Sequence, residues 1–347
     1  AYVSVLDTSL RLGCVFLLLL GNTDKLILYS VLTFVVSTII AFTYRIYCMR
    51  QFHECHFRFI WEKKILLPIL TFSGWDLFGN MSGIARGQGT NILQNMFFGP
   101  LLNSAVGIAN QVQAAINALA DNYLTAVRPQ IVKDYAIGNY SSMIMWLINA
   151  AKFAFILFLV LSLPLIIENK FILQVWLKNV PDYCVIFCQL SLIGISISIL
   201  FRPVMFSIHA TGKIRRMSLV NGTIYLLVLP VTYYLFKQGF DPTIPFILNI
   251  VAFILCGGFN LWILKFDFPE FSIKLYCQKV ICICFLIVIL SLPFPLCFYF
   301  YVDEGWWRFL LVCVSSCTSV LVMSYWIACD TEVKNQLRLT IKKYIKF

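Results

Sequence analysis

Two neighbouring segments, residues 66–98 and 103–127, carry polar residues at the spacing of one helix face. In the first segment, the polar or small residues recur every three or four positions: Asp76, Asn80, Gly83, Gly87, Thr90 and Gln94. In the second segment, the same kind of spacing connects Asn103, Gly107, Asn110, Ala114, Asn117, Asp121, Thr125 and Arg128. Residues three or four apart share a helix face. Each segment therefore predicts a helix with a polar stripe.

These stripes lie within apolar surroundings, where a polar side chain cannot face lipid cheaply. A central Asp or Arg costs at least about 2.5–3.5 kcal/mol in the bilayer. Tight helix packing explains the small residues of both stripes. It does not call for the combination of Asp76, Arg86, Asn110, Asn117 and Asp121. We therefore favour a hydrated cavity over a simple packed interface.

Other charged residues also fall inside apolar segments. Asp7 and Arg11 are four positions apart and can pair with each other, in either a structural or a functional role. Arg202 precedes Pro203, where a helix can bend and open. The cations Arg11, Arg86, Lys152 and Arg202 outnumber the carboxylates Asp7, Asp76 and Asp121. This excess favours an anionic head group as the ligand.

Composition excludes several classes of protein. The chain is 60% hydrophobic and 12% charged, whereas soluble domains carry about 25% charge. The net charge is +11, but the aromatic residues do not interleave with a basic groove, so we expect no nucleic-acid partner. Most cysteines lie in apolar runs and predict no disulfide framework.

Motifs for enzymatic chemistry are missing from the sequence. There is no phosphate-binding loop, no GxSxG, no HExxH and no kinase motif set. The string from His53 to His56 lacks the ligand spacing of a zinc site and is interpreted as a polar loop. We therefore expect transport rather than catalysis, with no metal and no cofactor beyond a coupling H⁺ or Na⁺.

The elements that must position these residues are membrane-spanning helices, each of which needs about 20 mainly apolar residues. Ten stretches qualify: 3–20, 26–44, 66–98, 103–127, 143–167, 184–208, 217–236, 243–264, 280–300 and 308–328. The sequence thus predicts an all-α integral membrane protein. A short interfacial helix near 171–177 and an amphipathic cytoplasmic helix at 331–347 complete the prediction.

Basic residues concentrate in alternate loops, which the positive-inside rule places in the cytoplasm. The cytoplasmic set comprises Arg45, Arg50, Arg58, Lys63, Lys64, Arg128, Lys133, Lys213, Arg215, Arg216, Lys265, Lys274, Lys279 and the basic tail. The opposite set holds only Lys25, Lys170, Lys178 and Lys237. Both ends of this chain are therefore predicted to be cytoplasmic.

Three stretches resemble a known family. They are FFGPLLNSAVGIANQ at 97–111, AVRPQIVKDYAIGN at 126–139, and FRP at 201–203 leading to ATGKI at 210–214. They are similar to the polysaccharide (O-antigen type, Wzx-like) flippases of the multidrug/oligosaccharidyl-lipid/polysaccharide exporter superfamily. The resemblance covers essentially the whole chain.

This resemblance implies a MATE-like transporter with two six-helix lobes, of which the first four helices would precede this sequence. Residues 1–64 would be the last two helices of the N-lobe plus a cytoplasmic inter-lobe loop. Residues 65–265 would form the six-helix C-lobe, and 266–347 two extra helices and a basic tail. The extra pair, 280–300 and 308–328, would offer a groove to the lipid tail.

The resemblance also implies alternating access in the bacterial cytoplasmic membrane and a polyprenyl-diphosphate-linked oligosaccharide as substrate. Its partners would be membrane lipids and the glycosyltransferases or polymerase of the same pathway. The substrate would be bound by Arg86, Arg11, Arg202, Gln94, Asn110 and Asn117. The coupling ion would be held by Asp76, Asp121 and Asp7.

Two alternatives stay open. A cation-coupled multidrug antiporter of the same superfamily predicts an acidic, aromatic-lined cavity. A membrane glycosyltransferase or polysaccharide polymerase predicts a large outer loop with paired carboxylates or arginines, and the sequence has no such loop.

Overall fold

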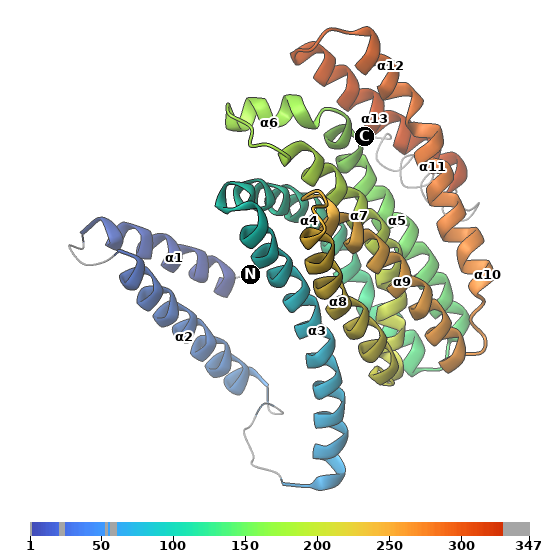
Figure 1. The fold of residues 1–347 in the computed structure, drawn as a ribbon. Coiled ribbons are helices and arrows are strands. Elements are labelled where there is room, and N and C mark those ends of the chain that lie inside the picture. Colours follow the sequence, from blue (N-terminus) through green and yellow to red (C-terminus); the bar gives the residue numbers. More distant parts are fainter. Residues whose placement is uncertain (1, 21–24, 53–54, 56–60, 329–347) are drawn as a thin grey trace, which may run out of the picture. The chain divides into compact units, whose positions relative to one another are not determined.

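The computed structural model describes residues 2–20, 25–52, 55 and 61–328, and its regular elements there are all helical (Figure 1). The amphipathic helix predicted at 331–347 lies outside the described residues. The elements are α1 (Tyr2–Leu20), α2 (Lys25–Gln51), α3 (Lys63–Phe98), α4 (Pro100–Ala136), α5 (Tyr140–Ile167), α6 (Asn169–Leu177), α7 (Cys184–Thr211), α8 (Arg215–Lys237), α9 (Ile244–Asp267), α10 (Ile273–Tyr276), the π-helix η1 (Cys277–Cys282), α11 (Ile283–Ser291), α12 (Pro293–Tyr301) and α13 (Trp306–Ile327).

Seven stretches in the described part of the chain are long and apolar enough to cross a membrane, so this is a multi-pass membrane protein. They are Ile27–Gln51, Tyr140–Ile167, Cys184–Thr211, Arg215–Lys237, Ile244–Asp267, Ile273–Tyr301 and Trp306–Ile327. The other three predicted spans correspond to α1, α3 and α4. All three form helices at the predicted places, and that they also cross the membrane stays a prediction.

Several predicted helices were too short. The helix predicted at 103–127 is α4, which begins at Pro100 and continues through Pro129 to Ala136. The span predicted at 280–300 begins earlier, with α10, and contains the π-helix. Hydropathy alone misses these ends, because polar residues can extend a helix beyond the hydrocarbon. The short helix predicted near 171–177 is confirmed as α6.

The chain divides into two compact units, residues 1–66 and 67–347. The first unit is built on the packed pair α1 and α2. In the second unit, α4 packs on α5 and α7, α7 packs on α5 and α9, and α8 packs on α9. The largest apolar core is formed mainly by α4, α5 and α7, and includes the fully buried Leu147, Phe158, Leu192 and Ile199.

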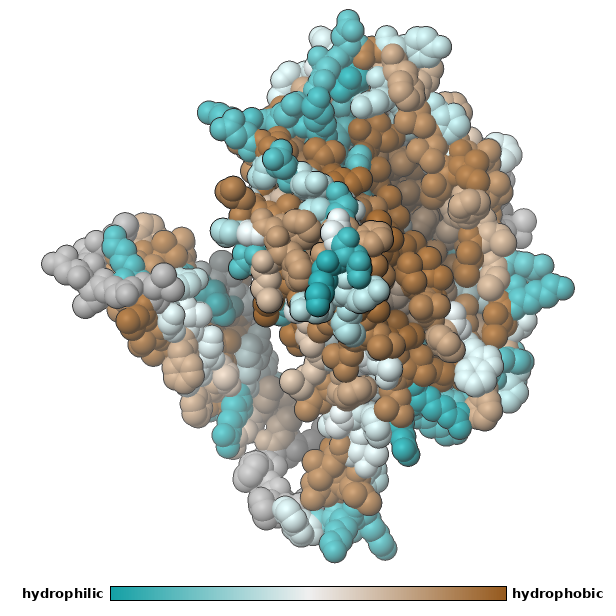
Figure 2. All heavy atoms as spheres, viewed as in Figure 1, coloured by the Kyte–Doolittle hydropathy of each residue, from teal (hydrophilic) through white to brown (hydrophobic). Residues whose placement is uncertain are grey.

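The outer surface of the second unit suits a hydrocarbon environment. Figure 2 shows a broad hydrophobic area over this unit, with hydrophilic residues gathered mostly near helix ends. Large apolar side chains of α9, such as those of Ile254, Phe259 and Trp262, are exposed. Lipid can cover such a surface at no cost, whereas water cannot.

Helix α13 is joined to α5 by polar contacts at both ends of α13. Arg308 at the start of α13 donates from Nε and Nη2 to Glu168, which caps α5, at 2.8 and 2.9 Å. Both residues are buried, with exposures of 9% and 1%. Near the other end, Lys152 Nζ of α5 donates to the carbonyl of Ala328, after α13, at 3.1 Å.

Gly257 lets α7 and α9 approach each other closely. A Cβ added at Gly257 of α9 would overlap the ring of Phe201 on α7, whereas a Cβ at the adjacent Gly258 would meet nothing. Phe201 therefore packs directly against the α9 backbone.

We expect Gly257→Val to destabilise the protein by about 1–3 kcal/mol, because the new side chain overpacks the α7–α9 contact. Thermal unfolding of the purified protein in detergent measures this loss. The matched control is Gly258→Val, with an expected change within about 0.5 kcal/mol. Equal losses in the two variants would contradict the packing described.

We expect Glu168→Gln to cost about 3–5 kcal/mol, because it leaves the buried Arg308 without a carboxylate. The same unfolding measurement tests this expectation. Glu304→Gln changes an exposed carboxylate in the same region and is expected to cost less than about 1 kcal/mol. A loss at Glu168 no larger than at Glu304 would show that the buried pair does not hold α13.

Candidate functional site

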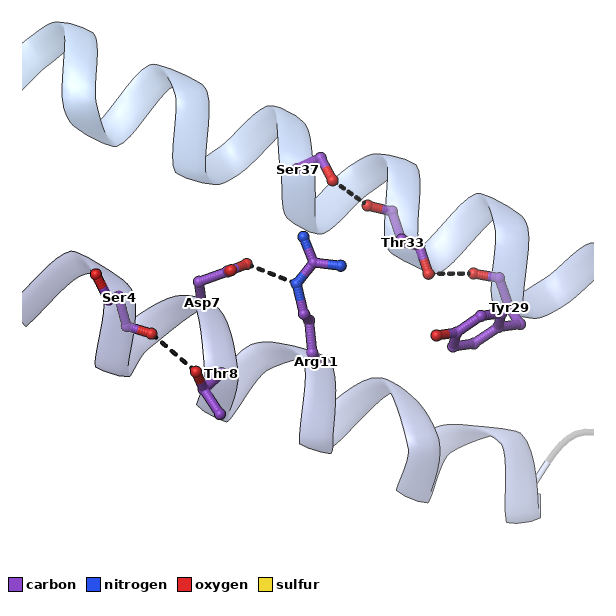
Figure 3. Close-up of polar contacts among 7 residues, drawn as sticks. All are labelled: Ser4, Asp7, Thr8, Arg11, Tyr29, Thr33 and Ser37. Carbon is purple, nitrogen blue, oxygen red and sulfur yellow. Dashed lines mark hydrogen bonds and ion pairs between the residues drawn. The ribbon is translucent and has the colours of Figure 1, made fainter. Parts of the chain in front are cut away.

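The predicted charged pair of the first unit is confirmed. Arg11 Nε donates to Asp7 Oδ1 at 2.9 Å within α1. Figure 3 shows both side chains directed toward α2, where Thr33 and Ser37 face them. The hydroxyls of Thr33 and Ser37 donate to carbonyls of their own helix at 2.8 Å. The α1–α2 hairpin thus has a polar face in which the Arg11 charge is already balanced.

In the second unit, the polar stripe of α3 lines two cavities. The Arg86 cavity, about 240 Å³, is lined by Arg86, Gly87, Gln88, Thr90, Asn91, Gln94, Val106, Asn110, Gln113, Leu190, Ser191, Gly194, Ile195, Pro245, Phe246, Asn249 and Phe253. The Asp76 cavity, about 150 Å³, is lined by Asp76, Gly79, Asn80, Gly83, Met205, His209, Met217, Ser218, Asn221 and Tyr225. Asp76 and Arg86 are ten residues apart, or about 15 Å along a helix. The predicted hydrated lining of α3 is therefore divided between two sites.

The Arg86 cavity is built around an unusual arginine. The guanidinium carbon of Arg86 lies 4.3 Å from the ring centre of Tyr225 on α8 and 4.8 Å from that of Phe253 on α9. Its Nε and Nη1 are buried and make no hydrogen bond to any described residue. Aromatic rings attract the cation but leave these N–H donors unused. A buried charged donor is costly unless a partner satisfies it.

Further unused polar atoms face the same cavity. Ser191 Oγ on α7 and Asn249 Oδ1 on α9 are buried and make no hydrogen bond within the described chain. Gln94 is held in place by its donation to the Pro242 carbonyl at 3.2 Å. The lining residues include no Asp or Glu. The cavity can therefore offer a positive fork and several amides to an anionic, oxygen-rich ligand.

The predicted residues on α4 divide between two places. Asn110 lines the Arg86 cavity together with Gln94 and Arg86, so three of the predicted ligand-binding residues come together there. Asn117 instead lies one turn before Asp121 and donates to its carboxylate at 2.5 Å. Much of the α4 stripe, including Asn110 and Thr125, is exposed in the second unit.

Arg202 and Asp121, assigned separate roles from the sequence, form an ion pair between α7 and α4. Arg202 is 17% exposed and Asp121 is 49% exposed. The carboxylate thus balances the Arg202 charge, which lowers the positive field that Arg202 offers to a ligand. Of the arginines predicted to bind substrate, Arg86 is the one with buried donors left unused in the described chain.

The Asp76 cavity has a different chemistry. Asp76 accepts a hydrogen bond from Asn80 Nδ2 at 3.0 Å, and His209 packs edge-on against Phe72 with ring centres 6.2 Å apart. Asn221 on α8 is 4% exposed, and its Oδ1 makes no hydrogen bond within the described chain. The polar part of this lining includes one carboxylate and the side-chain oxygens of Asn80, Ser218 and Asn221, which can accept a cation or a proton.

A metal centre finds no support in the described residues, where no three His, Cys, Asp or Glu side chains gather to hold a metal ion. Within the string from His53 to His56, only Cys55 belongs to the described part.

No protein-family model, curated protein or solved structure matches this chain.

Sequence reasoning missed the walls opposite α3. Ser191, Asn221 and Asn249 are polar residues within mainly apolar helices, and their presence there was an available signal. Tyr225 and Phe253 carried no signal, because aromatic residues in an apolar helix look alike whether they face lipid or a cation. Tyr225 lines the Asp76 cavity and also stacks on Arg86, so it belongs to both sites.

We expect Asp121→Asn and Arg202→Gln to be energetically coupled by about 1–3 kcal/mol in unfolding, because they remove the two halves of one ion pair. A double-mutant cycle in detergent measures the coupling. The control cycle combines Asp121→Asn with Arg128→Gln, whose guanidinium instead lies over the Phe206 ring, and should be additive. Additivity in the first cycle would contradict the pairing.

Proposed function

We propose that this chain belongs to a flippase that moves a lipid-linked, anionic saccharide across a membrane, and that the Arg86 cavity binds the polar head of that substrate. The observation that carries the proposal is the Arg86 guanidinium, which lies over two aromatic rings and has buried N–H donors without a described partner. A planar guanidinium fork pairs well with phosphate or carboxylate oxygens.

The remaining lining supports a saccharide. The side-chain amides of Asn91, Gln94, Asn110, Gln113 and Asn249 belong to residues that line the same cavity. Amides both donate and accept, as sugar hydroxyls do. With a volume of about 240 Å³, the cavity is smaller than a drug-sized site of about 300–1,000 Å³. It therefore suits the anionic group and an adjoining sugar, while the rest of the substrate lies outside.

We propose that the family is the O-antigen type flippases. The architecture is then MATE-like with two lobes, and this chain contributes ten membrane helices. Alternating access in the bacterial cytoplasmic membrane then follows, with a polyprenyl-diphosphate carrier supplied by glycosyltransferases and a polymerase acting downstream. The resemblance at 97–111 and 126–139 supports this assignment. In this proposal both chain ends are cytoplasmic, and the protein performs transport rather than catalysis.

The second candidate function is a cation-coupled multidrug antiporter, and the Asp76 cavity is the observation that favours it. Its carboxylate, imidazole and unused Asn221 oxygen suit a cation or proton. Drug resistance on expression, lost in Asp76→Asn, would support this candidate. Surface polysaccharide lost in Arg86→Ala supports the flippase.

We expect Arg86→Ala to reduce polysaccharide export about 10- to 100-fold, since it removes charged hydrogen bonds worth about 1.5–3 kcal/mol. Export is measured in cells that depend on this protein for surface polysaccharide. Arg86→Lys keeps the charge but loses the planar fork and should recover only part of the rate.

The matched control is Arg215→Ala, which removes an exposed arginine stacked on Trp75 at 5.2 Å. Export should persist in this variant. All variants are checked by immunoblot of the membrane fraction, so that failed insertion is recognised. Normal export in a fully inserted Arg86→Ala variant would refute the role of Arg86.

A further inference from the structure

Pro203 lies inside α7, which runs without interruption from Cys184 to Thr211. Proline has no N–H, so the carbonyl of Ile199 loses its usual helix partner, and the proline ring crowds that carbonyl. Membrane helices tolerate such a turn when neighbouring elements support it. The turn from Ile199 to Pro203 is thus where α7 bends most readily.

A tyrosine from a distant part of the chain supports this turn. Tyr276 is fully buried, and its hydroxyl donates to the carbonyl of Leu200. This carbonyl keeps a second lone pair for its own helix bond. Tyr276 ends α10 and directly precedes the π-helix Cys277–Cys282. Single π-helical turns often occur at functional sites.

The next two residues of α7 are held by other helices. The Phe201 ring lies against the backbone at Gly257 of α9. The Arg202 guanidinium pairs with Asp121 of α4. Three consecutive residues before Pro203 are therefore fixed by three separate elements, so a bend of α7 must break or shift these contacts together.

We propose that Tyr276 is a latch on the Pro203 turn of α7. While this hydrogen bond is formed, α7 keeps the conformation seen in the structure at Pro203, and Arg202 stays paired with Asp121. When the bond breaks, α7 bends at Pro203 and Arg202 leaves Asp121. The latch joins the C-terminal helices to the α4–α7 ion pair, and it operates whichever substrate the protein carries.

Hydrogen exchange on the full chain in lipid nanodiscs tests the latch. Tyr276→Phe removes the hydroxyl and keeps the ring. The amides around residues 200–207 should then exchange about fivefold faster, as expected for one lost buried hydrogen bond. Unchanged exchange there, or an equal acceleration in all helices, would overturn the proposal.

The matched control is Ser207→Ala. Its hydroxyl is also fully buried and donates to the Pro203 carbonyl at 3.1 Å, in the same helix. This bond connects α7 to no other element, so its loss should leave the exchange near the wild-type rate. Acceleration as large as in Tyr276→Phe would show that any lost hydroxyl loosens the turn.

A second measurement tests the link to the ion pair. The unfolding cycle of Asp121→Asn and Arg202→Gln is repeated in the Tyr276→Phe background. The coupling factor should fall by about fivefold, the same factor as the faster exchange. An unchanged coupling factor would overturn the connection between Tyr276 and Arg202.

Discussion

A polar atom buried in hydrocarbon needs a partner, because an unsatisfied group costs several kcal/mol there. The second unit meets this requirement with hydrogen bonds and ion pairs. Hydroxyls such as those of Ser207, Thr232 and Ser316 donate back to their own helices. Charged side chains pair across helices, as Glu168 does with Arg308. Several of the buried atoms without a described partner then collect at the Arg86 and Asp76 cavities, which is why these cavities are the candidate sites.

Helices α3 and α8 approach each other closely at two glycines, one on each helix. A Cβ at Gly89 would overlap Leu229 of α8, and one at Gly222 of α8 would overlap Phe78 of α3. These two contacts bring α8 close enough for Tyr225 to stack on Arg86. These glycines therefore act through packing, because they allow the Tyr225 ring of α8 to lie beside the polar stripe of α3.

Much of the helical layout could be predicted from hydropathy, since apolar runs of sufficient length identify helices such as α5, α7 and α13. The polar stripe of α3 could also be predicted, because a spacing of three and four residues defines one helix face. Its division between two cavities could not be predicted, because periodicity shows which residues share a face but not which residues lie opposite them. Pairing of Arg202 with Asp121, 81 positions apart, likewise depends on how α4 meets α7. Glu168 falls just outside the predicted span 143–167, and only the fold shows that it is buried beside Arg308.

The Tyr225 ring lines the Asp76 cavity and also contacts Arg86 of the other cavity. This shared contact can couple ligand binding in the two cavities. A ligand that draws Arg86 toward itself changes the stacking on Tyr225, and the same ring forms a wall of the Asp76 cavity. Linkage requires that if occupation of one cavity changes affinity in the other, the reverse effect is equal in size. A shared aromatic wall therefore offers a route by which a ligand in one cavity could change the binding of a ligand in the other, through a single side chain.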